Sequence, residues 1–122
     1  MTLPNTIEQI YSYAFADNYL LESINIPSSV KKISRYAFYY SRGLKNLVLD
    51  IGELEIYNGA FSGCNSLDKV FVLNGDIAEI TWTKGFVDAP FNNPFYYSEN
   101  EPTDEGNYWH YVDDVPTVWE ID

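Results

Sequence analysis

The sequence predicts a β-dominated α/β solenoid, because several residue types return at one fixed spacing of 23 positions. An Ala-Phe pair recurs at Ala14-Phe15, Ala37-Phe38 and Ala60-Phe61. A leucine recurs at Leu21, Leu44 and Leu67, and aliphatic residues follow it three and five positions later in every copy. Such self-similarity, with a period in the twenties, is typical of coils that stack on one another and bury one continuous core.

Each coil is expected to contribute a short inner strand and a turn of helix or 3₁₀ helix on the outer side. The inner strands are predicted near Ser23–Ile26, Asn46–Leu49 and Lys69–Val72, and we expect them to form one parallel sheet. The outer turn begins at the Ala-Phe pair, where alanine permits close approach and phenylalanine fills the space between coils.

The third and fourth coils depart from the strict period. Glu53 stands where the other coils have an aliphatic residue, so Leu54 is predicted to be the displaced core residue, with a local slip between Asp50 and Ile56. The fourth coil is expected to start at Ile77, and its inner strand is predicted at 93–97.

The C-terminal part differs in composition from the coils. Residues 98–107 are polar and acidic with Pro102 and Gly106, which predicts a loop. Tyr108–Val112 and Val115–Trp119 are rich in aromatic and β-branched residues, which predicts an antiparallel hairpin that covers Phe86, Phe91 or Phe95. We therefore expect a solenoid over residues 1–97 and an acidic loop and hairpin cap over 98–122, together forming one domain.

The repeat resembles a known family. Val30-x-x-Ile33-x-x-Tyr36-Ala37-Phe38 and the run from Ser62 to Leu67 are similar to the BspA-like leucine-rich repeat, and Gly106–Trp119 resembles the C-terminal end piece of such arrays in gut Firmicutes. The resemblance implies a leucine-rich-repeat solenoid with a non-catalytic role in adhesion or protein interaction. It also implies a location at the bacterial cell surface or in the secreted fraction, although the chain begins without the pattern of a signal peptide.

Charge and composition exclude several classes of partner. Eighteen acidic and seven basic residues give a net charge of −11, which argues against nucleic acid and anionic membranes, because their phosphates must be neutralised by lysine and arginine. Residues 81–122 alone contain nine acidic residues and one basic residue. No apolar run is long enough for membrane insertion.

No residue pattern indicates catalysis, a cofactor or a metal. Cys64 shares a column with Asn18 and Ser41, where a small polar side chain is expected to bond the turn backbone, so a structural role is favoured over a nucleophile. His110 lacks the cysteine or second histidine of a metal site. The acidic loop could suggest calcium, but its spacing matches no calcium loop and favours a solvated charge run.

The inner strands offer the candidate binding residues. If their aliphatic residues face the core, alternation turns two columns to the concave side. One column is Ser23, Asn46 and Lys69, and the other is Asn25, Val48 and Phe71, with Trp82 expected to join them. Val48 and Phe71 form either an exposed contact patch or a pair that packs together beneath the acidic loop.

Three functional hypotheses follow. The first is a recognition or adhesion module whose concave face contacts a protein or glycan ligand. The second is a structural spacer or end unit of a larger repeat protein, and the third, an enzyme, would need a carboxylate pair that the inner columns do not contain. The apolar N-terminal columns, which include Ile7, Ile10 and Phe15, are also expected to expose an edge for preceding repeats or for an end-to-end homo-oligomer.

Overall fold

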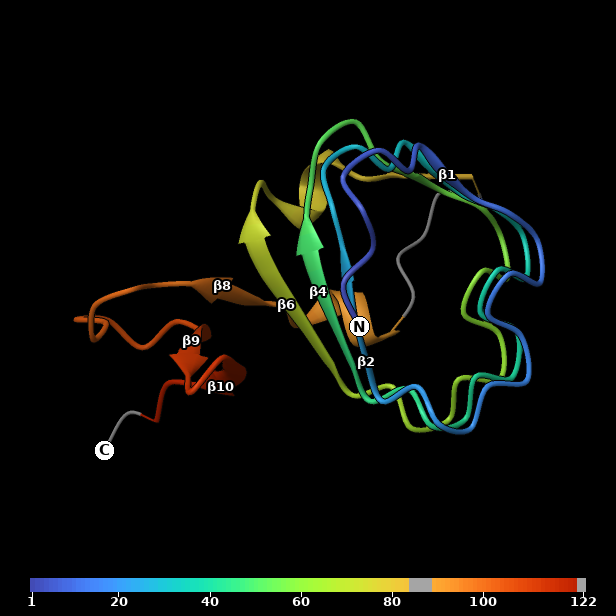
Figure 1. Ribbon diagram of the computed structural model, residues 1–122. Coiled ribbons are helices and arrows are strands. Elements are labelled where there is room, and N and C mark those ends of the chain that lie inside the picture. Colours follow the sequence, from blue (N-terminus) through green and yellow to red (C-terminus); the bar gives the residue numbers. More distant parts are fainter. Residues whose placement is uncertain (84–88, 121–122) are drawn as a thin grey trace.

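Two β-sheets, parallel throughout the coils, and a side of turns enclose the core in the computed structural model, which describes residues 1–83 and 89–120 (Figure 1). The four-stranded sheet has the order β1 (Gln9–Ile10), β3 (Lys32–Ile33), β5 (Glu55–Ile56) and β7 (Thr81–Trp82). The six-stranded sheet has the order β10-β9-β8-β6-β4-β2. Its strands are β2 (Ser23–Ile26), β4 (Asn46–Asp50), β6 (Lys69–Asn74), β8 (Phe95–Tyr97), β9 (Tyr108–Val112) and β10 (Val115–Val118).

The 23-residue period is the register of both sheets. Ile24 pairs with Leu47 and Leu47 with Val70 in the six-stranded sheet, in parallel, and all three are fully buried. The isoleucines of β1, β3 and β5 pair in the same way in the four-stranded sheet. The predicted parallel solenoid is therefore confirmed, and each coil contributes one strand to each sheet.

On the turn side, a ladder of phenylalanines runs through the core. Phe38 stacks on Phe15 and Phe61 with ring centroids 5.1 and 4.9 Å apart and interplanar angles of 9° and 12°. Ala37 and Ala60 are fully buried. The expected short helices are absent from these three outer segments, which are turns because residues with positive φ interrupt any helix. The described 3₁₀ helices come later, as η1 (Ile77–Glu79) and η2 (Ala89–Asn92).

The slip predicted in the third coil is present. Leu54 is buried and Glu53 is exposed, and the pairing of β4 with β6 shifts register between Leu49 and Asp50. The chain approaches its neighbour so closely at Gly52 that a Cβ there would lie 2.7 Å from the backbone oxygen of Ser28. The slip thus keeps an aliphatic side chain in the core although a glutamate occupies the regular position.

The C-terminal hairpin is also confirmed, and it extends the six-stranded sheet. β9 pairs in parallel with β8 and antiparallel with β10. Asp113 and Asp114 form a two-residue turn with φ of 51° and 64°, the geometry that a tight hairpin requires. Pro116 lies in the edge strand β10, where a missing N–H is tolerated.

The N-terminal edge of the six-stranded sheet has more backbone pairing than the sequence predicts. Thr2 forms a parallel bridge with Asn25, and Asn25 donates its backbone N–H to the Met1 carbonyl at 2.7 Å. Leu3 is buried. Residues 1–3 therefore pair with β2 within the chain, while β1 forms the edge of the other sheet. Among the residues that the structure describes, no helix is long and apolar enough to cross a bilayer.

Candidate binding surface

The candidate surface is the concave face, defined here as the side of β2, β4 and β6 that points away from the core. Strand alternation places two columns on it, as the sequence predicts. Ser23, Asn46 and Lys69 pair across the three strands and are partly exposed. The second column, Asn25, Val48 and Phe71, is in the same register, but Val48 and Phe71 are each only 2% exposed.

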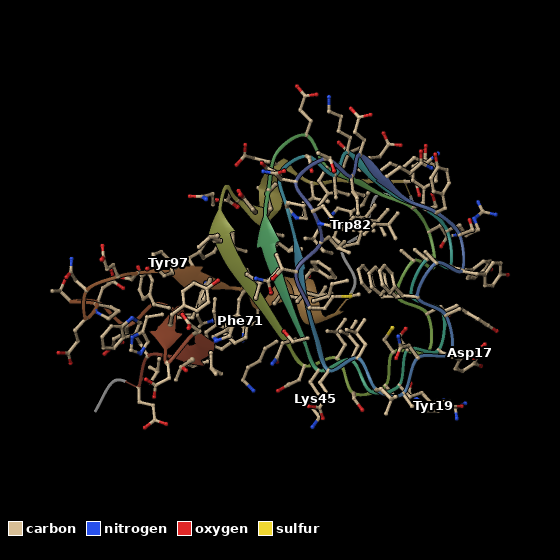
Figure 2. All side chains as sticks on the ribbon, in the orientation of Figure 1. Asp17, Tyr19, Lys45, Phe71, Trp82 and Tyr97 are labelled. Carbon is tan, nitrogen blue, oxygen red and sulfur yellow. The ribbon has the colours of Figure 1, made fainter. Side chains whose placement is uncertain are left out.

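The C-terminal hairpin covers the second column. Trp109 is fully buried and packs with Val48 and Phe71 in a cluster separate from the main core. Its ring centroid lies 5.3 Å from that of Phe71, and its Nε1–H donates to the Val72 carbonyl at 2.9 Å. Figure 2 shows Phe71 and Tyr97 on the side of the six-stranded sheet that carries the C-terminal strands.

The hairpin also reaches β2, the first inner strand. Tyr111 lies two residues beyond Trp109 on the same face of β9, and its hydroxyl lies near the side chain of Asn25. Burial raises the pKa of Tyr111, and the nearby Asn25 side chain opposes the rise. The column that the sequence analysis treats as either a contact patch or a packed pair is therefore packed, with the hairpin rather than the acidic loop above it.

The first column remains accessible, and its residues Asn46 and Lys69 lie on one wall of a groove. The groove has a volume of about 650 Å³, and Asn46, Lys69 and Phe71 lie on the sheet side of it. Pro116, Thr117 and Val118 of β10 and the following Glu120 form the opposite wall. The hairpin thus covers the second column and leaves the first beside an open cleft that is lined by both polar and apolar side chains.

The groove can recognise a ligand through hydrogen bonds and charge. Lys69 pairs with Asp68 at 2.7 Å, and the neighbouring Lys45 pairs with Glu22 at 3.2 Å. All four side chains are substantially exposed, so each pair contributes only about 0–1 kcal/mol to stability and can rearrange when a ligand binds. Asn46, which follows Lys45 and pairs with Lys69, adds an amide that can both donate and accept hydrogen bonds.

The structure places Trp82 away from the other predicted site residues. It lies in β7 of the four-stranded sheet, where its ring packs edge-on against Phe91 with centroids 5.0 Å apart. Trp82 therefore does not join the concave face as expected, because it pairs with Ile56 in the four-stranded sheet. Phe91 continues the phenylalanine ladder beyond Phe61, so the hairpin contacts Phe95 but not this part of the core. Phe86 lies outside the described residues.

The residues considered for chemistry have structural contacts. Cys64 Sγ donates to the Phe38 carbonyl at 2.9 Å, Ser41 Oγ donates to the Phe15 carbonyl, and Asn18 Oδ1 accepts from the Leu20 and Leu21 N–H groups. The predicted turn-bonding role of this column is confirmed. Burial raises the pKa of Cys64 to about 11, which keeps it a thiol.

The remaining candidates also have partners within the chain. His110 stacks on Trp119 with centroids 3.7 Å apart. In the acidic loop, Asp104 accepts from the Gly106 N–H and the Tyr108 hydroxyl. Within residues 1–83 and 89–120, no group of three or more histidine, cysteine or acidic side chains is arranged to hold a metal ion.

Sequence reasoning missed a second surface on the turn side, where tyrosines of the first two coils contact one another. The repeat pattern does contain an indication of this surface. Two columns that hold tyrosine or aspartate in the first two coils hold Gly59 and Gly63 in the third. Glycine in a repeat column indicates a left-handed backbone, so the residues that replace it are in an unusual conformation.

Comparison with known proteins identifies the repeat. A family model described as "BspA type Leucine rich repeat region (6 copies)" matches residues 1–83, about two thirds of the chain. No curated protein and no solved structure matches the chain significantly. The match spans the coils whose register and phenylalanine ladder are described above, and the chain belongs to the BspA-type leucine-rich repeat family.

Proposed function

We propose that the chain is a non-catalytic adhesion module of a bacterial surface protein and that it contacts a protein or glycan ligand through the groove. Leucine-rich repeats generally mediate protein binding, and repeats of this type are generally found in surface-associated bacterial proteins. The observation that carries the proposal is the pair of Asn46 and Lys69, whose polar side chains lie in register along one wall of the groove, with Ser23 next to them in the same accessible column.

A binding panel with matched variants tests this function. Purified extracellular-matrix proteins and glycans are immobilised, and binding is measured for the wild-type chain and for Asn46→Ala/Lys69→Ala. We expect the double variant to bind at least about tenfold more weakly, a loss of about 1.4 kcal/mol. Lys32→Ala is the control, because Lys32 lies in the four-stranded sheet over the ring of Tyr57.

Two results would count against the groove. Binding that survives in Asn46→Ala/Lys69→Ala would place the ligand elsewhere, and an equal loss in Lys32→Ala would show a general effect of charge. The protein and glycan arms of the panel distinguish the two ligand classes. Labelling of intact cells with an antibody against the chain tests the proposed surface location.

A second candidate, a structural end unit of a repeat array, is favoured by one observation. The hairpin covers Val48 and Phe71, which would otherwise be an apolar patch on the sheet. In this function the domain consists of the coils up to residue 97 and the C-terminal cover over 98–122. Deleting residues 107–122 should then cause aggregation or loss of cooperative unfolding. A truncated chain that is soluble and equally stable would exclude this role for the hairpin.

A further inference from the structure

The turn side of the first two coils carries a cluster of tyrosines. Tyr13 stacks on Tyr36 with ring centroids 5.8 Å apart, and Tyr39 packs edge-on against Tyr36 at 5.2 Å and against Tyr40 at 4.4 Å. Figure 2 shows Asp17, which lies in the same turns, on the side of the coils opposite Tyr97. This tyrosine cluster, defined as Tyr13, Tyr36, Tyr39 and Tyr40, is thus remote from the groove and from the hairpin.

Three of these tyrosines have a backbone conformation that bulky residues rarely adopt. The φ angles of Tyr13, Tyr36 and Tyr40 are 63°, 62° and 54°. The third coil has Gly59 and Gly63 in the equivalent positions, with φ of 74° and 77°. Glycine adopts this conformation freely, whereas a residue with a Cβ is strained. The fold alone therefore favours glycine at all of these positions, and strained residues of this kind tend to mark functional surfaces.

The glycines of the third coil also make room for the tyrosine rings of the second. A Cβ at Gly59 would lie 2.9 Å from the ring of Tyr36, and a Cβ at Gly63 would lie 2.5 Å from the ring of Tyr40. The rings therefore sit against bare backbone, and the neighbouring coil restricts their rotation. Aromatic side chains that are ordered in advance lose little entropy on binding, so they suit a recognition surface.

The only two arginines of the chain, Arg35 and Arg42, lie in the same turns. Both are exposed, and the guanidinium of Arg42 lies over the ring of Tyr40 at 5.0 Å from its centroid. The salt bridges among the described residues use lysines, so neither arginine is paired with a carboxylate there. Residues 34–43 contain both arginines and no acidic residue, and residues 11–20 of the neighbouring turn contain one acidic residue, Asp17, so the two turns carry a net charge of +1 in a chain with a net charge of −11.

We propose that the tyrosine cluster and its two arginines form a second binding surface, which takes an extended acidic segment of another protein. Each guanidinium can bind a carboxylate through two parallel hydrogen bonds, and the rings supply contact area for apolar side chains between the acidic ones. Tyrosine and arginine are the residues enriched at the energetic centres of protein interfaces. A second copy of the chain is a poorer occupant, because its own large negative charge opposes association.

Selection from a random peptide library displayed on phage tests the proposal. Peptides are selected on the wild-type chain and counter-selected on Arg35→Gln/Arg42→Gln. The enriched peptides should contain aspartate or glutamate next to apolar residues. As synthetic peptides at physiological salt, they should bind Arg35→Gln/Arg42→Gln at least about tenfold more weakly than wild type.

Three further variants make the result specific. Lys31→Gln/Lys45→Gln removes the same amount of charge outside the tyrosine cluster and should bind the peptides as tightly as wild type. Asn46→Ala/Lys69→Ala, in the groove, should also bind them as tightly as wild type. Tyr13→Gly/Tyr36→Gly/Tyr40→Gly should lose binding, yet its melting temperature should fall by less than about 3 °C, because relief of the left-handed strain offsets the lost ring contacts.

Several outcomes would overturn the proposal. One is a library that yields no peptide preferring wild type over Arg35→Gln/Arg42→Gln, and another is enrichment of peptides without acidic residues. An equal loss of peptide binding in Lys31→Gln/Lys45→Gln would show that the arginines act only through the overall charge of the chain. Binding of sialylated glycans in place of peptides, or self-association that the arginine variant abolishes, would assign the surface to a different occupant.

Discussion

Trp109 donates its indole Nε1–H to the backbone carbonyl of Val72 at 2.9 Å, across 37 residues of sequence. Val72 lies on the last regular inner strand, so this bond joins the C-terminal hairpin to the solenoid. The indole is fully buried and packs against Phe71 of β6, Tyr97 of β8 and Tyr111 of β9. The hairpin is therefore held on the concave face by a specific contact as well as by strand pairing.

Replacing Trp109 should be strongly destabilising. Trp109→Ala removes a large buried side chain and the hydrogen bond to Val72, and we expect a loss of about 3–5 kcal/mol in the free energy of unfolding. Chemical denaturation monitored by circular dichroism measures this loss. Trp119→Ala is the matched control and should cost less, because Trp119 is only partly buried. Equal effects of the two changes would show that Trp109 does not anchor the hairpin.

Phe38→Ala should be the most damaging change in the phenylalanine ladder. Phe38 is fully buried between Phe15 and Phe61, and its removal leaves a cavity that stiff neighbouring coils cannot fill. The expected loss in the free energy of unfolding is about 3–5 kcal/mol. Phe15→Ala, at the half-buried end of the ladder, should cost clearly less. A melting temperature of Phe38→Ala within a degree or two of wild type would refute the ladder as the centre of the core.

Cys64 should resist thiol reagents in the folded protein. Burial raises its pKa to about 11 from an ordinary value of about 8.5–9, so the reactive thiolate is scarce at pH 8. Reaction with a chromogenic disulfide should be slow in native buffer and fast in denaturant. Cys64→Ser should retain the bond to Phe38, as Ser41 retains the equivalent bond one coil earlier. Rapid labelling of the native protein at pH 8 would contradict a thiol protected by partial burial and a raised pKa.

A glycine in the hairpin turn should stabilise the protein. Asp114 has φ of 64°, which glycine adopts without strain, and Asp-Gly is a preferred pair for this turn. Asp114→Gly should therefore raise the free energy of unfolding by about 0.5–1 kcal/mol. Asp113→Ala, which keeps a Cβ in the left-handed region, should give no such gain. Destabilisation by Asp114→Gly in thermal unfolding would mean that its carboxylate has a stabilising contact.

Much of the fold can be predicted from sequence, because each coil repeats the same local requirements. The spacing of Ile24, Leu47 and Val70 determines which residues face the core, and a 23-residue period leaves one parallel register that keeps them there. Leu54 could be recognised as a displaced core residue for the same reason. The hairpin strands follow from the alternation around the Asp113-Asp114 turn.

The candidate site could be predicted only in part. Strand alternation identifies the columns that contain Asn46 and Phe71, but it says nothing about which column the C-terminal residues cover. The covered column depends on where β9 lies after it pairs with β8, and this is decided by a long-range contact in which Trp109 packs on Phe71. The expectation for Trp82 is wrong because the repeat pattern fades in the fourth coil, so the sequence does not reveal that Trp82 pairs with Ile56 in the four-stranded sheet.

Hydrogen exchange of the tryptophan indole protons, followed by nuclear magnetic resonance, tests most directly the central claim that the hairpin covers the second column of the concave face. If it does, the Nε1–H of Trp109 exchanges only when the whole domain unfolds, and its opening free energy equals that of global unfolding. The Nε1–H of Trp119, which donates to the Ser98 carbonyl at a more exposed site, should exchange faster. Exchange of the Trp109 proton at the rate of Trp119, under conditions in which β4 and β6 remain protected, would show that the concave face is open.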